Sequence, residues 1–322
     1  MVVQRTRLCL LVTAVCICIG FTSANKHTRI TELPEYYEVS AGSMATFRCN
    51  AVSDASLQLS IDWMYNGELI DFDNETRYVR FDNYSLTIIK TAELDSGTYT
   101  CVASTDLDKA QTQTTLIVQD VPNAPHLMDV VCNERDASIS WKPMGDNRAP
   151  INHFIIEYNT TFTPDVWEMA SDSVPPFDFT YTVPMSPWAN YTFRVLAINK
   201  IGPSSPSGHS RVCTTQPDVP YKNPDNVEGK GTEPSNIVIS WTPMPEIEHN
   251  APRFHYRVFW RRDIAGEQWN SDDILDWRKS ELVIPNQPTF QTYRIKVIAI
   301  NEKGESNVAP TEILGYSGED VP

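Results

Sequence analysis

The chain has 322 residues, of which 41% are hydrophobic and 21% are charged. This composition supports folded cores and excludes a chain that is disordered by composition, and the length suits two or three domains. The formal net charge of −15 argues against nucleic acid as a partner, because binding to phosphates needs a basic surface.

The N-terminal segment, residues 1–24, predicts a secretory signal peptide. Arg5 and Arg7 supply the positive start, residues 8–21 are apolar, and the small residues 22–24 predict cleavage after Ala24. A membrane anchor is the alternative, but an apolar run of this length is short for crossing a bilayer. We therefore expect a secreted or extracellular product, or a cell-surface one if the chain is a fragment of a membrane-anchored parent.

Cysteines and glycosylation motifs fit the same route. The four Cys that follow the leader are an even number in an oxidising compartment, so two disulfides with three possible connectivities are expected: Cys49, Cys101, Cys132 and Cys213. Four Asn-x-Ser/Thr tripeptides predict N-glycosylation at Asn74, Asn83, Asn159 and Asn190.

Strand signals dominate the rest of the chain. Short runs of β-branched and aromatic residues are broken roughly every eight to twelve residues by Pro, Gly, Asn and Asp, which predicts an all-β fold of tandem β-sandwiches. The tripeptide Asp-Val-Pro occurs at residues 120–122, 218–220 and 320–322. We interpret it as the exit from each sandwich, where Pro ends strand pairing.

The first unit, residues 30–119, contains Cys49, Trp63, Tyr99 and Cys101 in an order that resembles an immunoglobulin domain of the intermediate set. The resemblance implies that Cys49 and Cys101 bridge two sheets and that Trp63 packs on the bridge. It also implies that Tyr99, two residues before the second Cys, forms a tyrosine corner.

The second and third units, residues 122–216 and 219–317, repeat each other. The run ISWKPM at 139–144 matches ISWTPM at 239–244, and YTFRVLAINKIG at 191–202 matches YRIKVIAINEKG at 293–304. Both resemble the fibronectin type III domain, and the closeness of its first and last strands implies a Cys132–Cys213 disulfide. Where the family places Leu before the corner Tyr, this chain has Met185 and Gln287. The polar Gln287 makes the corner of the second copy depart from the family pattern, while the fold of that copy is still expected.

Longer runs, such as those at residues 184–202 and 299–320, are similar to the neuroglian family of neural cell-adhesion molecules. The matching part is the last immunoglobulin domain and the first two type III domains of that family. The resemblance implies an extracellular adhesion or recognition module, with a role in axon guidance. It also implies cell-surface or extracellular proteins as partners, including members of the same family.

Catalytic motifs are not found. The six His have no metal-ligand spacing, and no hydrolase, phosphate-loop or dinucleotide motif occurs, so we expect no enzyme, no cofactor, no metal and no small-molecule substrate. The acidic clusters at 71–73 and 272–273 raise the question of a calcium site, but we interpret them as solvated loop carboxylates. A soluble receptor-like binder, an inert spacer stalk and a muscle-like intracellular array remain as alternatives. The missing Trp-Ser-x-Trp-Ser motif opposes the first, and the leader and cysteines oppose the last.

A candidate contact patch lies in the third unit. Strand alternation places Arg257, Phe259 and Arg261 on the outer face, beside Arg294 and Lys296 of a neighbouring strand. This patch would suit an acidic protein or glycan. The alternative is that neighbouring carboxylates balance these cations. All four glycosylation motifs precede this unit, which favours it for close protein contact.

Overall fold

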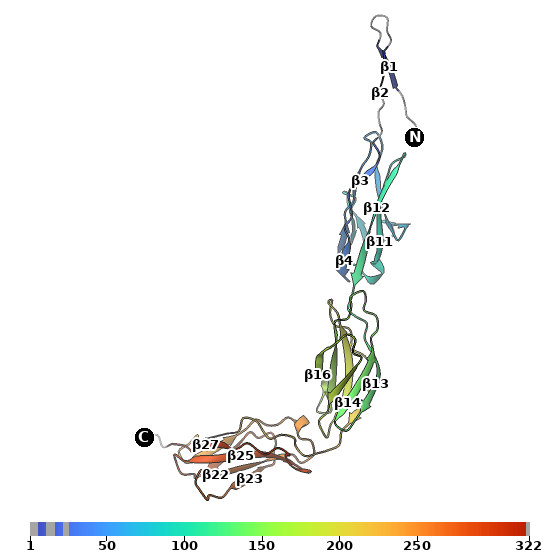
Figure 1. Cartoon of the computed structure of the whole chain (residues 1–322). Helices are drawn as coiled ribbons and strands as arrows, with labels where there is room; N and C mark the ends of the chain where they lie inside the picture. The colour runs from blue at the N-terminus through green and yellow to red at the C-terminus, as the bar shows by residue number, and fades with distance from the viewer. Residues whose placement is uncertain (1–5, 11–16, 22–25, 320–322) are drawn as a thin grey trace. The chain divides into compact units, whose positions relative to one another are not determined.

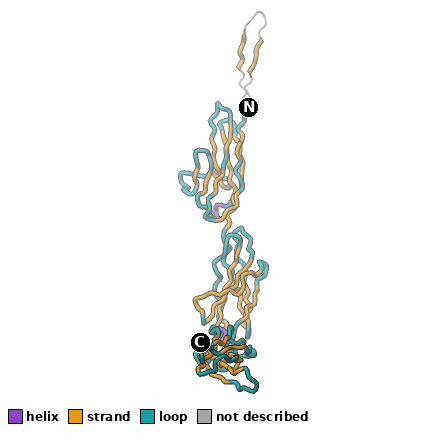
Figure 2. The backbone as a smooth tube through the Cα atoms, turned by 90° about the vertical axis from the view of Figure 1, so that its left-hand side faces the viewer, coloured by secondary structure: helices purple, strands orange, loops and turns teal. Residues whose placement is uncertain are grey.

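The computed structural model describes residues 6–10, 17–21 and 26–319. It divides into two compact units, one formed by residues 1–121, 146–150 and 200–202, and the other by residues 122–145, 151–199 and 203–322. Strands dominate both units (Figures 1 and 2). In the described ranges the only helical segments are two short 3-10 turns, η1 (Glu93–Asp95) and η2 (Glu246–Glu248). The all-β prediction is therefore confirmed.

The predicted leader falls largely outside the described residues, and so does its cleavage site after Ala24. Two short strands are described within it, β1 (Thr6–Leu10) and β2 (Ile17–Phe21), which pair in antiparallel fashion. The secretory role of this segment stays a prediction.

The first sandwich packs a three-stranded sheet, in the order β5-β10-β9, against a five-stranded sheet, in the order β4-β12-β11-β7-β8, and β3 pairs with β6. Alternation along β11 explains the packing, because Tyr99, Cys101 and Ala103 are fully buried while their neighbours are not. The strands are β3 (Arg29–Glu32), β4 (Tyr37–Ser40), β5 (Ala45–Phe47), β6 (Asn50–Val52), β7 (Ser60–Tyr65), β8 (Glu68–Leu69), β9 (Tyr78–Arg80), β10 (Leu86–Ile88), β11 (Gly97–Ser104) and β12 (Lys109–Gln119).

The second sandwich packs the sheet β13-β14-β17 against the sheet β16-β15-β18-β19. Every second residue of β18 is buried, from Tyr191 to Ala197, and Trp141 of β14 lies in the same core. The strands are β13 (His126–Cys132), β14 (Asp136–Lys142), β15 (His153–Thr160), β16 (Thr163–Val174), β17 (Thr180–Pro184), β18 (Asn190–Ile198) and β19 (Cys213–Thr214).

The third sandwich repeats this plan with one change, because β27 pairs with both β25 and β20 and so joins the two layers along one edge. The resulting order is β23-β22-β25-β27-β20-β21-β24, with β26 beside β25. Its strands are β20 (Glu228–Lys230), β21 (Asn236–Ser240), β22 (His255–Arg262), β23 (Asn270–Ile274), β24 (Glu281–Pro285), β25 (Thr292–Asn301), β26 (Gly304–Glu305) and β27 (Ile313–Tyr316).

The first two Asp-Val-Pro tripeptides are each held by a loop of the repeat that follows them. Asp120 N–H donates to the Asn147 carbonyl at 3.2 Å, and the Asn147 amide returns a bond to the Val121 carbonyl at 2.7 Å. The same pair of bonds recurs at the second tripeptide. Asp218 N–H donates to the Asn250 carbonyl at 2.9 Å, and the Asn250 side-chain amide donates to the Val219 carbonyl at 3.0 Å. Both Asn residues have positive φ, of 51° and 62°. The tripeptide is therefore an entry element for the next repeat as well as an exit from the previous one.

Candidate interaction surfaces and covalent sites

The first disulfide joins Cys49 to Cys101 with their Cα atoms 6.5 Å apart, as predicted. Trp63 is buried in the same core, and its indole N–H donates to the Tyr84 carbonyl at 2.8 Å. The Tyr99 hydroxyl donates to the Asp95 carbonyl at 2.9 Å, so the predicted tyrosine corner is present. Burial raises the pKa of Tyr99, which keeps this donor neutral.

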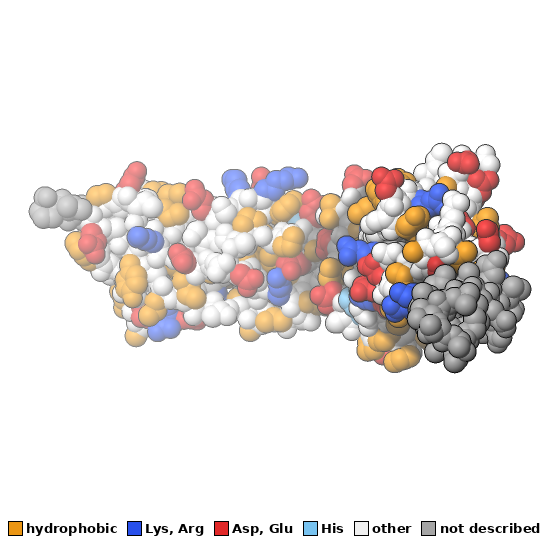
Figure 3. All heavy atoms as spheres, turned by 90° about the horizontal axis from the view of Figure 1, so that it is seen from above, with side chains coloured by type: hydrophobic (Ala, Val, Ile, Leu, Met, Phe, Trp, Pro, Cys, Tyr) orange, Lys and Arg blue, Asp and Glu red, His pale blue; other side chains and the backbone are white. Residues whose placement is uncertain are grey.

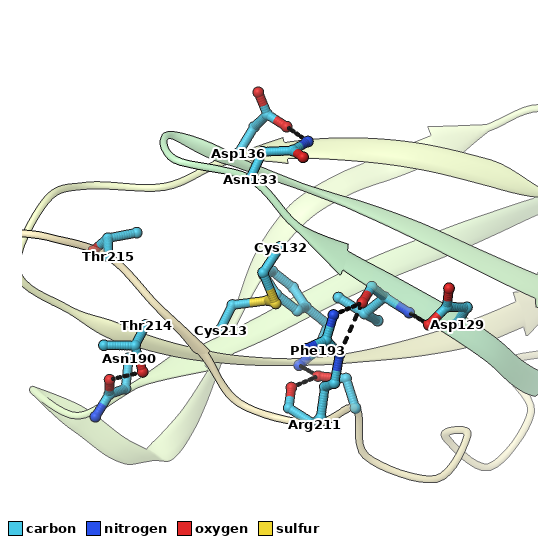
Figure 4. Close-up of a disulfide and its surroundings, with 12 residues drawn as sticks. Asp129, Cys132, Asn133, Asp136, Asn190, Phe193, Arg211, Cys213, Thr214 and Thr215 are labelled. Atoms are coloured by element: carbon cyan, nitrogen blue, oxygen red, sulfur yellow. Dashed lines mark hydrogen bonds between the residues drawn. A yellow bond between two sulfur atoms is a disulfide. The ribbon is translucent and has the colours of Figure 1, made fainter.

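The second disulfide joins Cys132, at the end of β13, to Cys213 of β19, with Cα atoms 5.5 Å apart (Figure 4). The pairing is as predicted. Beside it, the Arg211 guanidinium donates twice to the Val130 carbonyl, at 3.1 and 2.8 Å, across the same gap between the two sheets. The disulfide thus ties β13, the first strand of the second sandwich, to β19, its last strand.

Sequence reasoning missed the segment that leads to this disulfide, the serine segment of residues 203–212. Ser204, Ser207 and Ser210 each accept a hydrogen bond at 2.9 Å from a backbone N–H of β18. Their own N–H groups donate back to β18 carbonyls at 2.8 to 3.0 Å. Each serine hydroxyl also donates to the carbonyl of the next residue.

This repeat of three residues is the period of a polyproline II helix, not of a strand. The signal in the sequence was the spacing of the serines, which continues to Cys213, together with Pro203 and Pro206. It was hidden because Ser- and Pro-rich stretches ordinarily indicate loops.

The four predicted glycosylation acceptors lie in the first two sandwiches. Asn74 and Asn83 are exposed, whereas Asn159 and Asn190 are half-buried on the paired strands β15 and β18. The Asn159 amide donates to the Pro164 carbonyl at 3.0 Å, and Asn190 accepts from the Thr214 hydroxyl at 2.7 Å. Attachment of glycans at these positions stays a prediction.

The predicted contact patch is brought together by the pairing of β22 with β25. Phe259 lies opposite Lys296, and Arg261 lies opposite Arg294. The alternating residues Tyr256, Val258, Tyr293 and Ile295 are buried, so the patch residues lie on the outer face of the sheet, as the alternation predicted.

Two of the patch cations are neutralised by carboxylates. Arg257 contacts Asp273 at 2.6 Å and Glu305 at 3.6 Å, while Arg294 contacts Asp263 at 2.7 Å and Glu312 at 3.1 Å. The hydrogen bond to Asp273 raises the pKa of Arg257, and the same bond lowers the pKa of Asp273, so both groups are held charged. The guanidinium groups of these two arginines are therefore already paired with carboxylates of the same sandwich.

The remaining patch residues, Phe259, Arg261 and Lys296, gather around Trp269, and we call these four residues the cation–aromatic stack. The Lys296 ammonium lies 5.1 Å from the Phe259 ring and 4.5 Å from the Trp269 ring, and the Arg261 guanidinium lies 4.8 Å from Trp269. Among the described residues no carboxylate forms an ion pair with Lys296 or Arg261. Such contacts contribute about 0.5–1 kcal/mol at exposed sites.

The second sandwich carries a related but smaller arrangement. The Arg194 guanidinium lies 4.1 Å from the Trp167 ring, and Arg194 forms an ion pair with Glu157 at 2.5 Å. Sequence reasoning did not assign Trp167 or Trp269 to a surface, although their matching positions in the two repeats were visible.

No group of metal-ligating side chains occurs within the part of the chain that the structure describes. Asp71, in one of the acidic clusters, accepts hydrogen bonds from the Asn74 side-chain amide and from the backbone N–H groups of Asp73 and Asn74, and these bonds lower its pKa. On the face that Figure 3 shows, acidic and basic side chains are interspersed.

Comparison with known proteins agrees with this architecture. The immunoglobulin I-set domain model matches residues 28–118, and the fibronectin type III domain model matches residues 123–212. Neuroglian of Drosophila melanogaster is 59% identical over 303 residues, which cover 94% of this chain and 23% of that protein. Neural cell adhesion molecule L1 of Homo sapiens is 38% identical over 301 residues, covering 92% and 24%.

The chain thus spans about a quarter of the length of these relatives. In its described residues, no helix has the length and apolar character needed to cross a membrane.

Proposed function

We propose that this chain, a relative of neuroglian and of the L1 adhesion molecules, is an extracellular adhesion or recognition module that acts through protein–protein contacts and not through catalysis. The observation that carries the proposal is the 59% identity to neuroglian over 94% of the chain. The two sheet-linking disulfides are consistent with it, because such bonds persist in oxidising compartments outside the cytosol.

The same proposal includes the leader and the domain limits. Residues 1–24 would direct secretion, and residues 30–119, 122–216 and 219–317 would be the three modules. N-glycans at Asn74, Asn83, Asn159 and Asn190 would cover parts of the first two modules and leave the third free of sugar.

We place the main protein contact on the cation–aromatic stack of the third sandwich. Aromatic side chains and Arg are enriched at protein interfaces, because they bury a large area at a modest cost in conformational entropy. Arg261 and Lys296 lack carboxylate partners among the described residues, so a partner with an acidic surface would supply them. Partners of this kind would be other cell-surface proteins, including copies of the same family.

The test is adhesion of beads that carry the secreted chain, both to each other and to cultured neuronal cells. We expect Arg261→Glu with Lys296→Glu to reduce bead binding about tenfold. The matched control is Arg278→Glu with Lys279→Glu, which changes the charge equally. Arg278 is likewise stacked on a Trp, at 4.8 Å from Trp277, but it lies outside the patch. The control should bind like the unmodified chain.

Two results would count against the proposal. Failure of the unmodified beads to bind to cells or to each other would contradict the adhesion function. Equal loss of binding in both double variants would show that net charge matters and that the cation–aromatic stack does not.

A further inference from the structure

The first sandwich contains the same glycosylation motif twice, and the two copies have different local structures. Phe-Asp-Asn-Glu-Thr occupies residues 72–76, and Phe-Asp-Asn-Tyr-Ser occupies residues 81–85. In both, an aromatic ring precedes the acceptor Asn by two positions. The sequence alone therefore does not distinguish Asn74 from Asn83.

The second copy forms a tight turn between β9 and β10. Tyr84 N–H donates to the Phe81 carbonyl at 2.9 Å, and Phe81 N–H donates to the Ser85 carbonyl at 3.1 Å. Tyr84 has a φ of 63°, which is typical of the bulge residue in hairpin loops of this length. Its carbonyl accepts from the buried Trp63 indole at 2.8 Å, so the turn is fixed to the core.

This turn places Phe81 and Asn83 on one face. Both line a shallow depression on the three-stranded sheet, together with Met44, Thr46 and Thr87. Phe81 is 53% exposed, which is unusual for so large an apolar side chain. The side-chain amide oxygen of Asn83, Oδ1, accepts from Ser85 N–H at 3.1 Å and from the Ser85 hydroxyl. The amide nitrogen, which would carry a glycan, is thereby oriented within a fixed side chain.

The first copy offers no such surface. Phe72 packs against the core of the sandwich, and the Arg80 guanidinium lies 5.3 Å from its ring. The Asn74 amide nitrogen donates to the Asp71 carboxylate at 2.6 Å. A glycan on Asn74 would therefore meet a ring that is already in contact with the protein.

We propose that Phe81 is a stacking platform for the first N-acetylglucosamine of an N-linked glycan on Asn83, and that Phe72 has no such role for Asn74. The glycan would arrive by transfer from a lipid diphosphate donor to the Asn83 amide nitrogen, which loses one proton as the lipid diphosphate leaves. The C–H face of the sugar would cover the exposed ring and Met44, while its polar groups remain in water. This placement rests on glycosylation of Asn83 and is independent of any adhesion partner.

The experiment uses the full chain secreted from eukaryotic cells, with one acceptor kept in each series. In the first series only Asn83 remains, through Asn74→Gln, Asn159→Gln and Asn190→Gln, and in the second series only Asn74 remains. An endoglycosidase trims the glycan to one N-acetylglucosamine, and intact mass reports occupancy. Each series is made with Phe81 or with Phe81→Ala, and with the acceptor present or changed to Gln.

Hydrogen exchange of the β11 amides then reports the opening equilibrium of the first sandwich within the full chain. With Phe81, we expect the sugar on Asn83 to lower the opening constant about fivefold, which corresponds to one well-packed aromatic contact. With Phe81→Ala the effect should fall below twofold. On Asn74 the sugar should give less than a twofold effect with either residue at position 81.

Three results would overturn the proposal. One is an unoccupied Asn83 in the intact mass. Another is an equal effect of the Asn83 sugar with Phe81 and with Phe81→Ala. The third is a stabilisation by the Asn74 sugar as large as that by the Asn83 sugar.

Discussion

The second and third sandwiches are copies of one sequence repeat, yet they attach their last segment to the neighbouring strand in different ways. In the third sandwich β27 pairs with β25 through a regular main-chain ladder. In the second, serine hydroxyls accept from alternate N–H groups of β18, and the Cys132–Cys213 disulfide completes the attachment. The comparison teaches that the repeat specifies the inner strands, while the last strand is free to change its chemistry.

The second and third sandwiches also differ in the hydrogen bonds of their corner tyrosines, Tyr191 and Tyr293. The Tyr191 hydroxyl accepts from Ser186 N–H at 2.8 Å, whereas the Tyr293 hydroxyl donates to the Gln287 side chain at 2.8 Å. The polar residue that departs from the family pattern therefore supplies a hydrogen-bond partner. The corner of the second copy thus departs from the family pattern in its residue type and makes a hydrogen bond through that residue.

Removal of the second disulfide should produce the largest difference between the two repeats. We expect Cys132→Ala with Cys213→Ala to reduce the free energy of unfolding of the second sandwich by about 2–5 kcal/mol, because the open chain gains conformational freedom. Hydrogen exchange, followed separately for the amides of each sandwich, measures this loss of stability, and the third sandwich is the internal control. An equal loss in both sandwiches would contradict the assignment of the disulfide to local closure.

A single serine should have a smaller effect. We expect Ser207→Ala to cost about 1–3 kcal/mol in the second sandwich, because it leaves the buried N–H of Val195 without its partner. Ser205→Ala is the matched control, since Ser205 is exposed and lies between the bonded positions. Protection of the Val195 amide is the direct readout, and unchanged exchange at Val195 would show that the hydroxyl is dispensable.

The smallest expected effect is a pH dependence of the stability of the third sandwich. His249 is buried against Phe254, with ring centroids 3.9 Å apart, and burial lowers its pKa despite the nearby carboxylates of Glu246 and Glu248. The unfolded chain then binds more protons than the folded one, so stability should fall as pH drops from about 6.5 through the lowered pKa. Urea unfolding at several pH values measures the slope.

The control for this titration is His249→Phe, which keeps an aromatic ring and removes the titrating group. This variant should lose the pH slope in the third sandwich, whatever its absolute stability. The second sandwich should show no matching slope in either protein. A slope that persists in the variant would assign the pH dependence to another group.

Much of the fold could be predicted from the sequence, because its determinants are periodic or covalent. Alternation predicted which residues of β22 and β25 face outward, and the domain resemblances led to both cysteine pairs. The serine segment could not be recognised, since a three-residue period matches neither a helix nor a strand. The carboxylate partners of Arg257 and Arg294 could not be assigned from the sequence either. They come from other strands and loops, so their identity depends on the register in which the strands pair.

The serine segment has a consequence for how copies of this protein meet each other. An ordinary outer strand offers N–H and C=O groups at a two-residue spacing, onto which another chain can add and begin aggregation. Here the spacing is three residues, and Pro203 and Pro206 have no N–H to offer. An incoming strand would find no matching ladder, so this side of the second sandwich resists fibril-like growth at high local protein concentration.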